Sequence, residues 1–188
     1  MIRTNVLGLA ICLASLGYQE GAGAAEHEFS VDVFASTTHT NAAPAVAEAP
    51  AWWTLFGLGA MYATGPILAG VSVESGAPEG LHSGTWGNEF ASVSGGVTHH
   101  LSDWFRADLT AELGIHWFVQ TGWGTESQQR YYAGLTPALR LSLGGTARAE
   151  LSLAVPVRCD FGTTRSREGD VLGGITFGPR LGFGLQLR

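Results

Sequence analysis

Apolar and polar residues alternate along most of this chain. In the segment 28–35 the residues at 29, 31, 33 and 35 are apolar, and the segments 130–143 and 147–161 continue the alternation over longer stretches. A period of two residues is that of a β-strand whose faces meet different surroundings. The segment 105–120 also has an apolar residue every four positions, but all of its odd positions are apolar, so the helical spacing follows from the strand pattern.

Eight segments fit this pattern. Two of them, 52–64 and 86–100, are rich in glycine and alternate imperfectly, and they are included because the arrangement of the others requires them. In all eight, the candidate for the apolar outer face is an odd-numbered residue, which predicts regular hairpins without bulges. The predicted strands lie near residues 28–36, 52–64, 66–75, 86–100, 104–121, 129–143, 146–161 and 169–187.

The connections between these segments alternate in length. Turns of one to three residues lie around Gly65, Ser102 and Gly144. Short turns at one rim and long loops at the other predict an all-β fold, an antiparallel up-and-down barrel of eight strands that crosses a membrane with both termini at the short-turn rim. The longer, more polar connections are 37–51, 76–85, 122–128 and 162–168.

The polar face of the strands indicates which side meets water. Between its charged residues this face carries small ones such as Gly114, Gly134 and Ala138. An eight-stranded barrel has an interior just wide enough for side chains to fill, so charged groups there need small neighbours. We therefore predict that the polar face lines the lumen and the apolar face meets lipid. A soluble calycin-like carrier, with its apolar face inside, stays open as an alternative.

The N-terminal residues are expected to be removed. Arg3, the apolar run 6–17 and the small residues 22–24 are typical of a secretory signal peptide over residues 1–24. The barrel domain is then 25–188. Cleavage would also remove Cys12 and leave Cys159 without a partner, so no internal disulfide is expected.

Charged residues are sparse and unevenly chosen. They make up 14% of the chain, against about 25% in a typical soluble domain, and all ten basic residues are arginine. The net charge of −6 and the lack of a basic cluster argue against a nucleic-acid partner. No Cys or His spacing suits zinc and no phosphate-binding loop is present, so neither a metal nor a cofactor is expected.

This order of strands, turns and loops resembles that of the small eight-stranded outer-membrane barrels of the OmpA/OmpX type, over nearly all of residues 25–188. The resemblance implies a place in the bacterial outer membrane, with outer-membrane lipids, lipopolysaccharide and the outer-membrane assembly machinery as partners. Such barrels usually end on an aromatic residue. Here Leu187 takes that place and Arg188 follows.

Charged residues of the polar face are predicted to meet inside the barrel. Partners across the turn near 145 sum to about 290, and those across the loop near 165 to about 330, which sets Glu150 beside Arg140 and Arg180. Arg130 pairs with Asp160 in the same way, and Glu112 reaches toward that row. Because isolated buried ions are costly, we predict a lumenal network of Arg106, Asp108, Glu112, His116, Arg130, Arg140, Glu150, Asp160 and Arg180.

Aromatic residues are expected to mark the two membrane interfaces. Those predicted near the long-loop ends of their strands are Trp53, Trp117, Trp123, Tyr131 and Phe161. Those predicted near the short-turn ends are Trp104, Phe105 and Phe183. The prolines at 137, 156 and 179 lack the N–H that a closed barrel needs, and each is expected to mark a bulge or a rim position where the parity breaks.

We expect a structural or surface-interaction protein that is not an enzyme. Two alternatives remain. One is a small gated pore, which the resemblance implies through the Arg–Glu gate of OmpA-like barrels. The other is an enzyme that modifies lipid A by acyl transfer or deacylation, for which His116 lies near the right rim but no Ser is placed beside it. His99 and His100, next to Ser102 and Asp103, lie at the opposite rim.

Overall fold

The computed structural model describes residues 27–40, 52–78, 86–120, 126–161, 164–165, 171–172 and 174–187. The predicted signal peptide 1–24, Trp123 and most of the long connections lie outside the described residues. Among these residues no helix is long and apolar enough to cross a membrane. The strands are β1 His27–Thr40, β2 Trp52–Thr64, β3 Ile67–Pro78, β4 Trp86–Ser102, β5 Phe105–Gln120, β6 Glu126–Gly144, β7 Ala147–Ala154, β8 Val157–Phe161, β9 Thr164–Arg165, β10 Val171–Leu172, β11 Ile175–Phe177 and β12 Arg180–Leu187.

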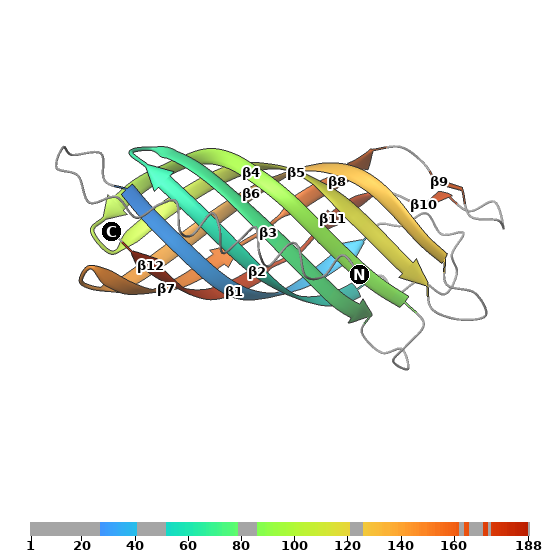
Figure 1. The fold of residues 1–188 in the computed structure, drawn as a ribbon, viewed down its shortest axis with the longest axis horizontal. Coiled ribbons are helices and arrows are strands. Elements are labelled where there is room, and N and C mark those ends of the chain that lie inside the picture. Colours follow the sequence, from blue (N-terminus) through green and yellow to red (C-terminus); the bar gives the residue numbers. More distant parts are fainter. Residues whose placement is uncertain are drawn as a thin grey trace.

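The strands close into one antiparallel ring (Figure 1). Each strand from β1 to β5 pairs with the next one along the chain, and β6 also pairs with both β7 and β8. Strand β7 pairs with β12, and β8 pairs with β11. Both β11 and β12 pair with β1, which closes the ring. Since β7 and β8 form one line of strand, as do β11 and β12, the ring has eight lines. The predicted all-β up-and-down barrel of eight strands is confirmed.

The two ends of the barrel differ as predicted. The start of β1, the end of β12 and the short turn between β6 and β7 lie together at the left in Figure 1. The small β9–β10 ladder extends the last hairpin at the other end. We call these the short-turn rim and the long-loop rim.

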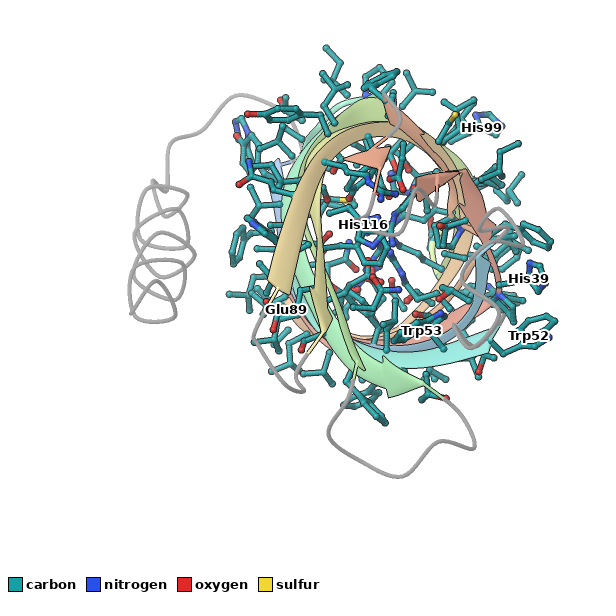
Figure 2. All side chains as sticks on the ribbon, turned by 90° about the vertical axis from the view of Figure 1, so that its right-hand side faces the viewer. His39, Trp52, Trp53, Glu89, His99 and His116 are labelled. Carbon is teal, nitrogen blue, oxygen red and sulfur yellow. The ribbon has the colours of Figure 1, made fainter. Side chains whose placement is uncertain are left out.

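Side chains alternate between lumen and outer wall. In β12 every even residue from Arg180 to Gln186 is buried and every odd residue from Leu181 to Leu187 is exposed. Figure 2 looks along the barrel from the long-loop rim and shows side chains both filling the ring and covering its outside. The inward set contains all the buried charged residues together with small residues and a few large apolar ones such as Trp53 and Phe90, whereas the exposed large side chains of the outward set are leucine, valine, isoleucine and aromatic. The apolar face is therefore the outer one.

Strand β2 departs from the predicted parity. There the odd residues face inward: Trp53 and Leu55 are 0% exposed, whereas Phe56 is 64% exposed. Relative to β3 the cause is the turn Gly65–Pro66, in which two residues separate the paired Thr64 and Ile67, and relative to β1 it is the register that pairs His39 with Trp52. An even number of turn residues makes an even position pair with an odd one and so exchanges the faces. Gly65 adopts a φ of 53°, a left-handed conformation that glycine accepts readily.

The turn between β4 and β5 shows how such an exchange is reversed. Asp103 and Trp104 also form a two-residue turn, because Ser102 pairs with Phe105. A register shift between His100 and Ser102 then restores the even-to-even pairing, so His100 faces Arg106. The prediction of hairpins without bulges is therefore wrong at this turn, and the bulge is what keeps β4 and β5 in phase.

The prolines interrupt hydrogen bonding without changing the register. Pro156 separates β7 from β8, and Pro179 separates β11 from β12, while the pairing Arg180 with Ala154 and Phe177 with Val157 continues unchanged across both. Pro137 stays inside β6. The carbonyls remain in use: Val155 N donates to Pro137 O at 3.0 Å and Thr37 N donates to Pro179 O at 3.1 Å. The expected local break in parity at these prolines does not occur.

Candidate functional site

Large side chains fill the lumen, and glycines on the inner face make room for them. A Cβ at Gly114 would meet the Tyr132 ring at 2.5 Å, and one at Gly134 would meet Cγ of Arg158 at 3.0 Å. These inward glycines alternate with outward Ile115 and Leu135 on the same strands. The pattern of charge next to glycine on the polar face therefore has a packing cause.

A first cluster of charges crosses the barrel near the short-turn rim. Arg106 on β5 reaches Glu28 on β1, with Nη1 2.6 Å from Oε2, and its Nη2 donates to Glu150 at 2.9 Å. Arg140 donates to the other oxygen of Glu150, and its Nε lies 2.8 Å from Asp108. Because β1 and β5 stand on opposite sides of the ring, this lower brace spans its full width.

A second cluster crosses the middle of the barrel in the perpendicular direction. Arg158 on β8 donates to both carboxylate oxygens of Glu74 on β3, and Arg180 donates to one of them. Arg158 Nε also lies 3.2 Å from Glu112, whose other oxygen accepts from Thr136. In the eight-line ring β3 and β8 are opposite each other. We call this the middle brace.

Aromatic rings cover the arginines of the middle brace. The Arg158 guanidinium carbon lies 4.7 Å from the Phe90 ring centre and 5.4 Å from that of Tyr132. The Arg180 guanidinium lies 4.3 Å over Phe34. A cation over an aromatic face is stabilised by the ring quadrupole. These buried arginines thus have both carboxylate and aromatic partners.

Nearer the long-loop rim, His116 is held on both sides. Its Nδ1 lies 3.1 Å from Asp160 Oδ2, and its Nε2 lies 2.5 Å from Asn88 Oδ1. The ring stacks on Phe90 at a centroid distance of 4.1 Å. Arg130 forms a longer ion pair with Asp160 at 3.7 Å. Both ring nitrogens of His116 therefore already have partners.

An apolar cluster lies on the same side of the middle brace as His116. It consists of Trp53, Leu55, Phe90 and Tyr132, each no more than 2% exposed. Figure 2 shows Trp53 and His116 inside the ring, and His39, Trp52 and His99 outside it. We call this group the aromatic cap.

The structure brings the predicted lumenal residues inside but in a different pairing. Glu150 lies opposite Ser142 and Gly184, a few residues from the predicted register, so Arg180 does not meet it and binds Glu74 instead. Arg140 still reaches Glu150 diagonally. The prediction missed Glu28, Glu74, Asn88, Arg158 and Gln186. All five lie at even positions in strands with the predicted parity, which was the available signal.

The aromatic prediction needs two corrections. Trp53 lies in the lumen because β2 is inverted, and Trp52 faces outward in its place. Phe183 lies opposite Val33 near the middle of β1, away from the short-turn rim, because the register places Leu187 opposite Phe29 at that rim. Among the other predicted aromatics, Trp104, Tyr131 and Phe161 are exposed on the outer wall, and Phe105 and Trp117 are partly exposed.

The outer wall is apolar around the whole ring. Among the described residues, outward leucine, valine, isoleucine or phenylalanine side chains that are more than two-fifths exposed occur on all eight lines, among them Phe56, Leu113 and Leu185. Soluble monomers rarely expose contiguous apolar patches above about 300–600 Å². A closed ring of strands with apolar residues outside and paired charges inside is the surface of a barrel that crosses a lipid bilayer.

No protein-family model and no curated protein matches the chain. Solved structures do. Neisserial surface protein A matches with a TM-score of 0.60 and 11% identity, over 88% of this chain and 99% of its own. The fold is that of the small outer-membrane β-barrels. The N-terminal β-barrel domain of Pseudomonas aeruginosa OprF matches at 0.53 and 16% identity, over 84% and 97%. Ail of Yersinia pestis, solved with the heparin analogue sucrose octasulfate, matches at 0.56 and 13%, over 86% and 99%.

Proposed function

We propose that this protein is a bacterial outer-membrane barrel with a structural or surface-interaction role and a lumen that does not conduct. The apolar outer wall supports a place in the membrane. The long-loop rim then faces the cell exterior, and the short-turn rim with both ends of the barrel faces the periplasm.

The observation that carries this proposal is the pair of perpendicular braces beneath the aromatic cap. A cavity of about 40 Å³ lies between the braces, lined by Asp108, Arg140, Glu112 and Arg180 among others. A space of that size holds about three waters at most. A gated pore, the alternative reading, would need a charge pair that exchanges partners. Here Glu74 and Glu150 each bind two arginines, which opposes such an exchange.

Single-channel recording in planar bilayers tests the closed lumen. The refolded chain is expected to give no discrete conductance steps, and to remain silent as Trp53→Ala, because the two braces lie below the cap. Its folded state is checked in the same preparation by gel mobility with and without boiling. Discrete steps that Glu150→Ala alters would replace this proposal by a pore.

An enzymatic role is not part of the proposal. A base-assisted nucleophile must lie within hydrogen-bond reach of its base. The nitrogens of His116 are engaged by Asp160 and Asn88 instead. Overexpression is expected to leave lipid A unchanged. Altered lipid A that reverts with His116→Ala would overturn this reading.

The partners we propose are lipopolysaccharide and other outer-membrane lipids at the wall, and the assembly machinery during insertion. A surface ligand would meet the long connections. The complex of Ail with a heparin analogue shows that one barrel of this fold holds a polyanion. Arg165 and Arg167 lie in the last connection of this chain. Binding of the refolded protein to immobilised lipopolysaccharide, lost in an Arg165→Ala/Arg167→Ala variant, tests this role.

A further inference from the structure

Carboxylates outnumber arginines in the lumen. Among the side chains that the structure describes, seven carboxylates and five arginines point inward, so even a charged His116 would leave one carboxylate in excess. The carboxylates are those of Glu28, Asp32, Glu74, Asp108, Glu112, Glu150 and Asp160, and the arginines are Arg106, Arg130, Arg140, Arg158 and Arg180. This part of the lumen therefore lacks positive charge.

Asp32 is a lumenal carboxylate without an ion pair. It lies on β1, where the absence of a Cβ at Gly59 and Gly182 leaves room for its two oxygens. No described arginine lies within ion-pair distance of it, and Arg140 and Arg180 act on it only from farther away. Both of these arginines donate to other carboxylates. No contact among the described residues thus compensates the charge of Asp32.

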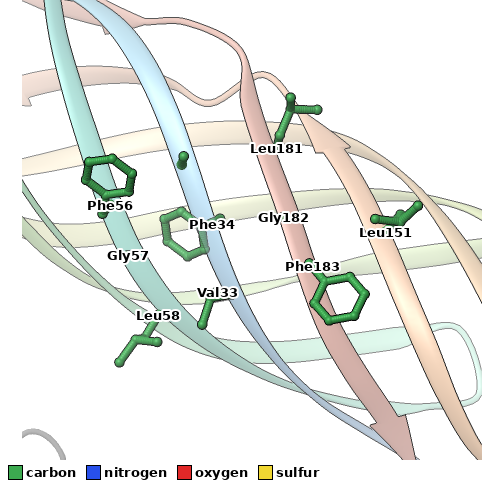
Figure 3. Close-up of a pocket in the computed structure, with 10 residues that line it drawn as sticks. Val33, Phe34, Phe56, Gly57, Leu58, Leu151, Leu181, Gly182 and Phe183 are labelled. Atoms are coloured by element: carbon green, nitrogen blue, oxygen red, sulfur yellow. The ribbon is translucent and has the colours of Figure 1, made fainter.

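The outside of this stretch of wall is apolar. Val33, the residue after Asp32, pairs with Leu58 of β2 and Phe183 of β12, and Figure 3 shows these side chains on the three adjacent strands. Desolvation of an unpaired ion is costly. An ionised carboxylate behind such a wall therefore needs a positive charge beside it.

Asp108 brings a second unsatisfied oxygen to the same place. Its side chain is 1% exposed, and its Oδ2 lies 2.8 Å from Arg140 Nε. Its Oδ1 has no hydrogen-bond partner among the described residues. Asp32 and Asp108 both line the cavity between the braces, and they reach it from β1 and β5 on opposite sides of the ring.

Hydroxyl oxygens complete the lining of this cavity. They belong to Ser72, Ser94, Thr110, Thr136 and Ser152. Thr110 donates its proton to the carbonyl oxygen of Thr136 at 3.4 Å, and the Thr136 hydroxyl donates to Glu112. The oxygens of these two threonines are therefore left as acceptors. Hard cations take oxygen ligands of this kind.

We propose that this cavity of about 40 Å³ holds one monovalent metal cation, such as sodium, between Asp32 and Asp108. The inference rests on the closed lumen of the proposed function. The described residues contain no group of three His, Cys, Asp or Glu placed to hold a metal ion, which favours a singly charged ion over a divalent one. Arg140 and Arg180 at the edge of the cavity favour the lower charge as well.

Urea unfolding of the refolded full chain in micelles tests the site. Sodium chloride replaces choline chloride stepwise at constant ionic strength, since choline is too large for the cavity. The pH is kept mildly alkaline, so that carboxylates in water are ionised. If one ion binds only the folded state, the folding equilibrium constant should rise about tenfold for each tenfold rise in sodium above the dissociation constant.

The variants assign this dependence to the cavity. Asp32→Asn keeps the shape of the side chain and removes its charge, so it should abolish the sodium dependence. Asp160→Asn is the matched control and should keep the native dependence, because it removes a buried lumenal carboxylate that does not line the cavity. Equal stability of the native chain in sodium and in choline, or a sodium dependence that survives in Asp32→Asn, would overturn the site.

A proton on Asp32 is the competing explanation, and a pH series in choline chloride separates the two. If acidification stabilises the native chain but not Asp32→Asn, while sodium has no effect, a proton neutralises Asp32 and the cation proposal is wrong.

The mobility shift on boiling and the bilayer recordings separate these outcomes from failure of the proposed function. A folded barrel that is silent in bilayers and insensitive to sodium overturns only the cation site. Discrete conductance steps contradict the closed lumen itself.

Discussion

Arg158 holds Glu74 from the opposite side of the barrel, through both carboxylate oxygens. The two residues are 84 positions apart in the chain and both are buried, with Arg158 1% exposed. A brace of this kind joins the two halves of the ring through its interior, independently of the hydrogen bonds in the wall.

Removal of the carboxylate should therefore destabilise the barrel strongly. Glu74→Ala leaves Arg158 and Arg180 in the lumen without that partner. Breaking a buried ion pair costs about 3–5 kcal/mol. We expect a loss of that order in the free energy of unfolding, measured by urea titration in micelles. Ser75→Ala on the outer face of the same strand is the control, and similar midpoints for the two variants would contradict the brace.

The outward face of β2 can be tested by depth. Leu58 faces lipid opposite the middle of β1, so Leu58→Arg should cost about 2–4 kcal/mol, whereas Trp52→Arg at the rim should cost about 0–1. The measurement is the folded fraction after refolding into vesicles across a urea series. If Leu58→Arg folds as readily as the native chain, Leu58 does not meet lipid.

The close contact between β1 and the neighbouring strands β11 and β12 depends on a glycine. A Cβ at Gly178 would collide with the carbonyl oxygen of Thr37 on β1. Gly178→Ala should therefore force the strands apart, at a cost of about 1–3 kcal/mol, as for other overpacked sites. A Cβ at Gly145 would have no neighbour within 4 Å, so Gly145→Ala is the matched control. The temperature at which the folded gel band disappears should fall for the first variant only.

The thiol of Cys159 reports the environment of the wall. It is exposed on the outer face, between Ile175 and Ala133 of the neighbouring strands. In a Cys12→Ser background, a charged maleimide should leave Cys159 unmodified in vesicles and label it once the chain is unfolded in urea. A lipid-soluble pyrene maleimide should react in both states. Rapid labelling of the vesicle-bound barrel by the charged reagent would place this face in water.

The alternation was enough to predict the fold and the lumenal face. Seven of the eight lines keep one parity, and the charged residues of the two braces all lie at even positions of these lines. The inversion of β2 escaped prediction because it depends on whether the connections on both sides of the strand contain an even or an odd number of residues. Glycines at 57 and 59 also weaken the contrast between the faces of this strand, so the side chains alone do not reveal it.

Cross-lumen partners were beyond the reach of the sequence for a different reason. Neighbouring strands are related by a turn, whose length approximately fixes the register. Glu74 and Arg158 are related only through the curvature of the closed ring and the lengths of their side chains. A shift of a few residues in the register near 145 and 165 was enough to assign Arg180 to the wrong carboxylate.

The long separation of these partners has a consequence for how the chain assembles. Glu28 finds Arg106 across 78 residues, and Glu74 finds Arg180 across 106. The half of the wall formed by β1 to β4 contains Glu28 and Glu74 but none of the arginines that bind them, and would expose these carboxylates to the hydrocarbon. Insertion strand by strand is thus unfavourable until the last line meets the first. Contacts between residues so far apart in the sequence slow folding. Here they make the closure of the ring and the pairing of the charges one cooperative event.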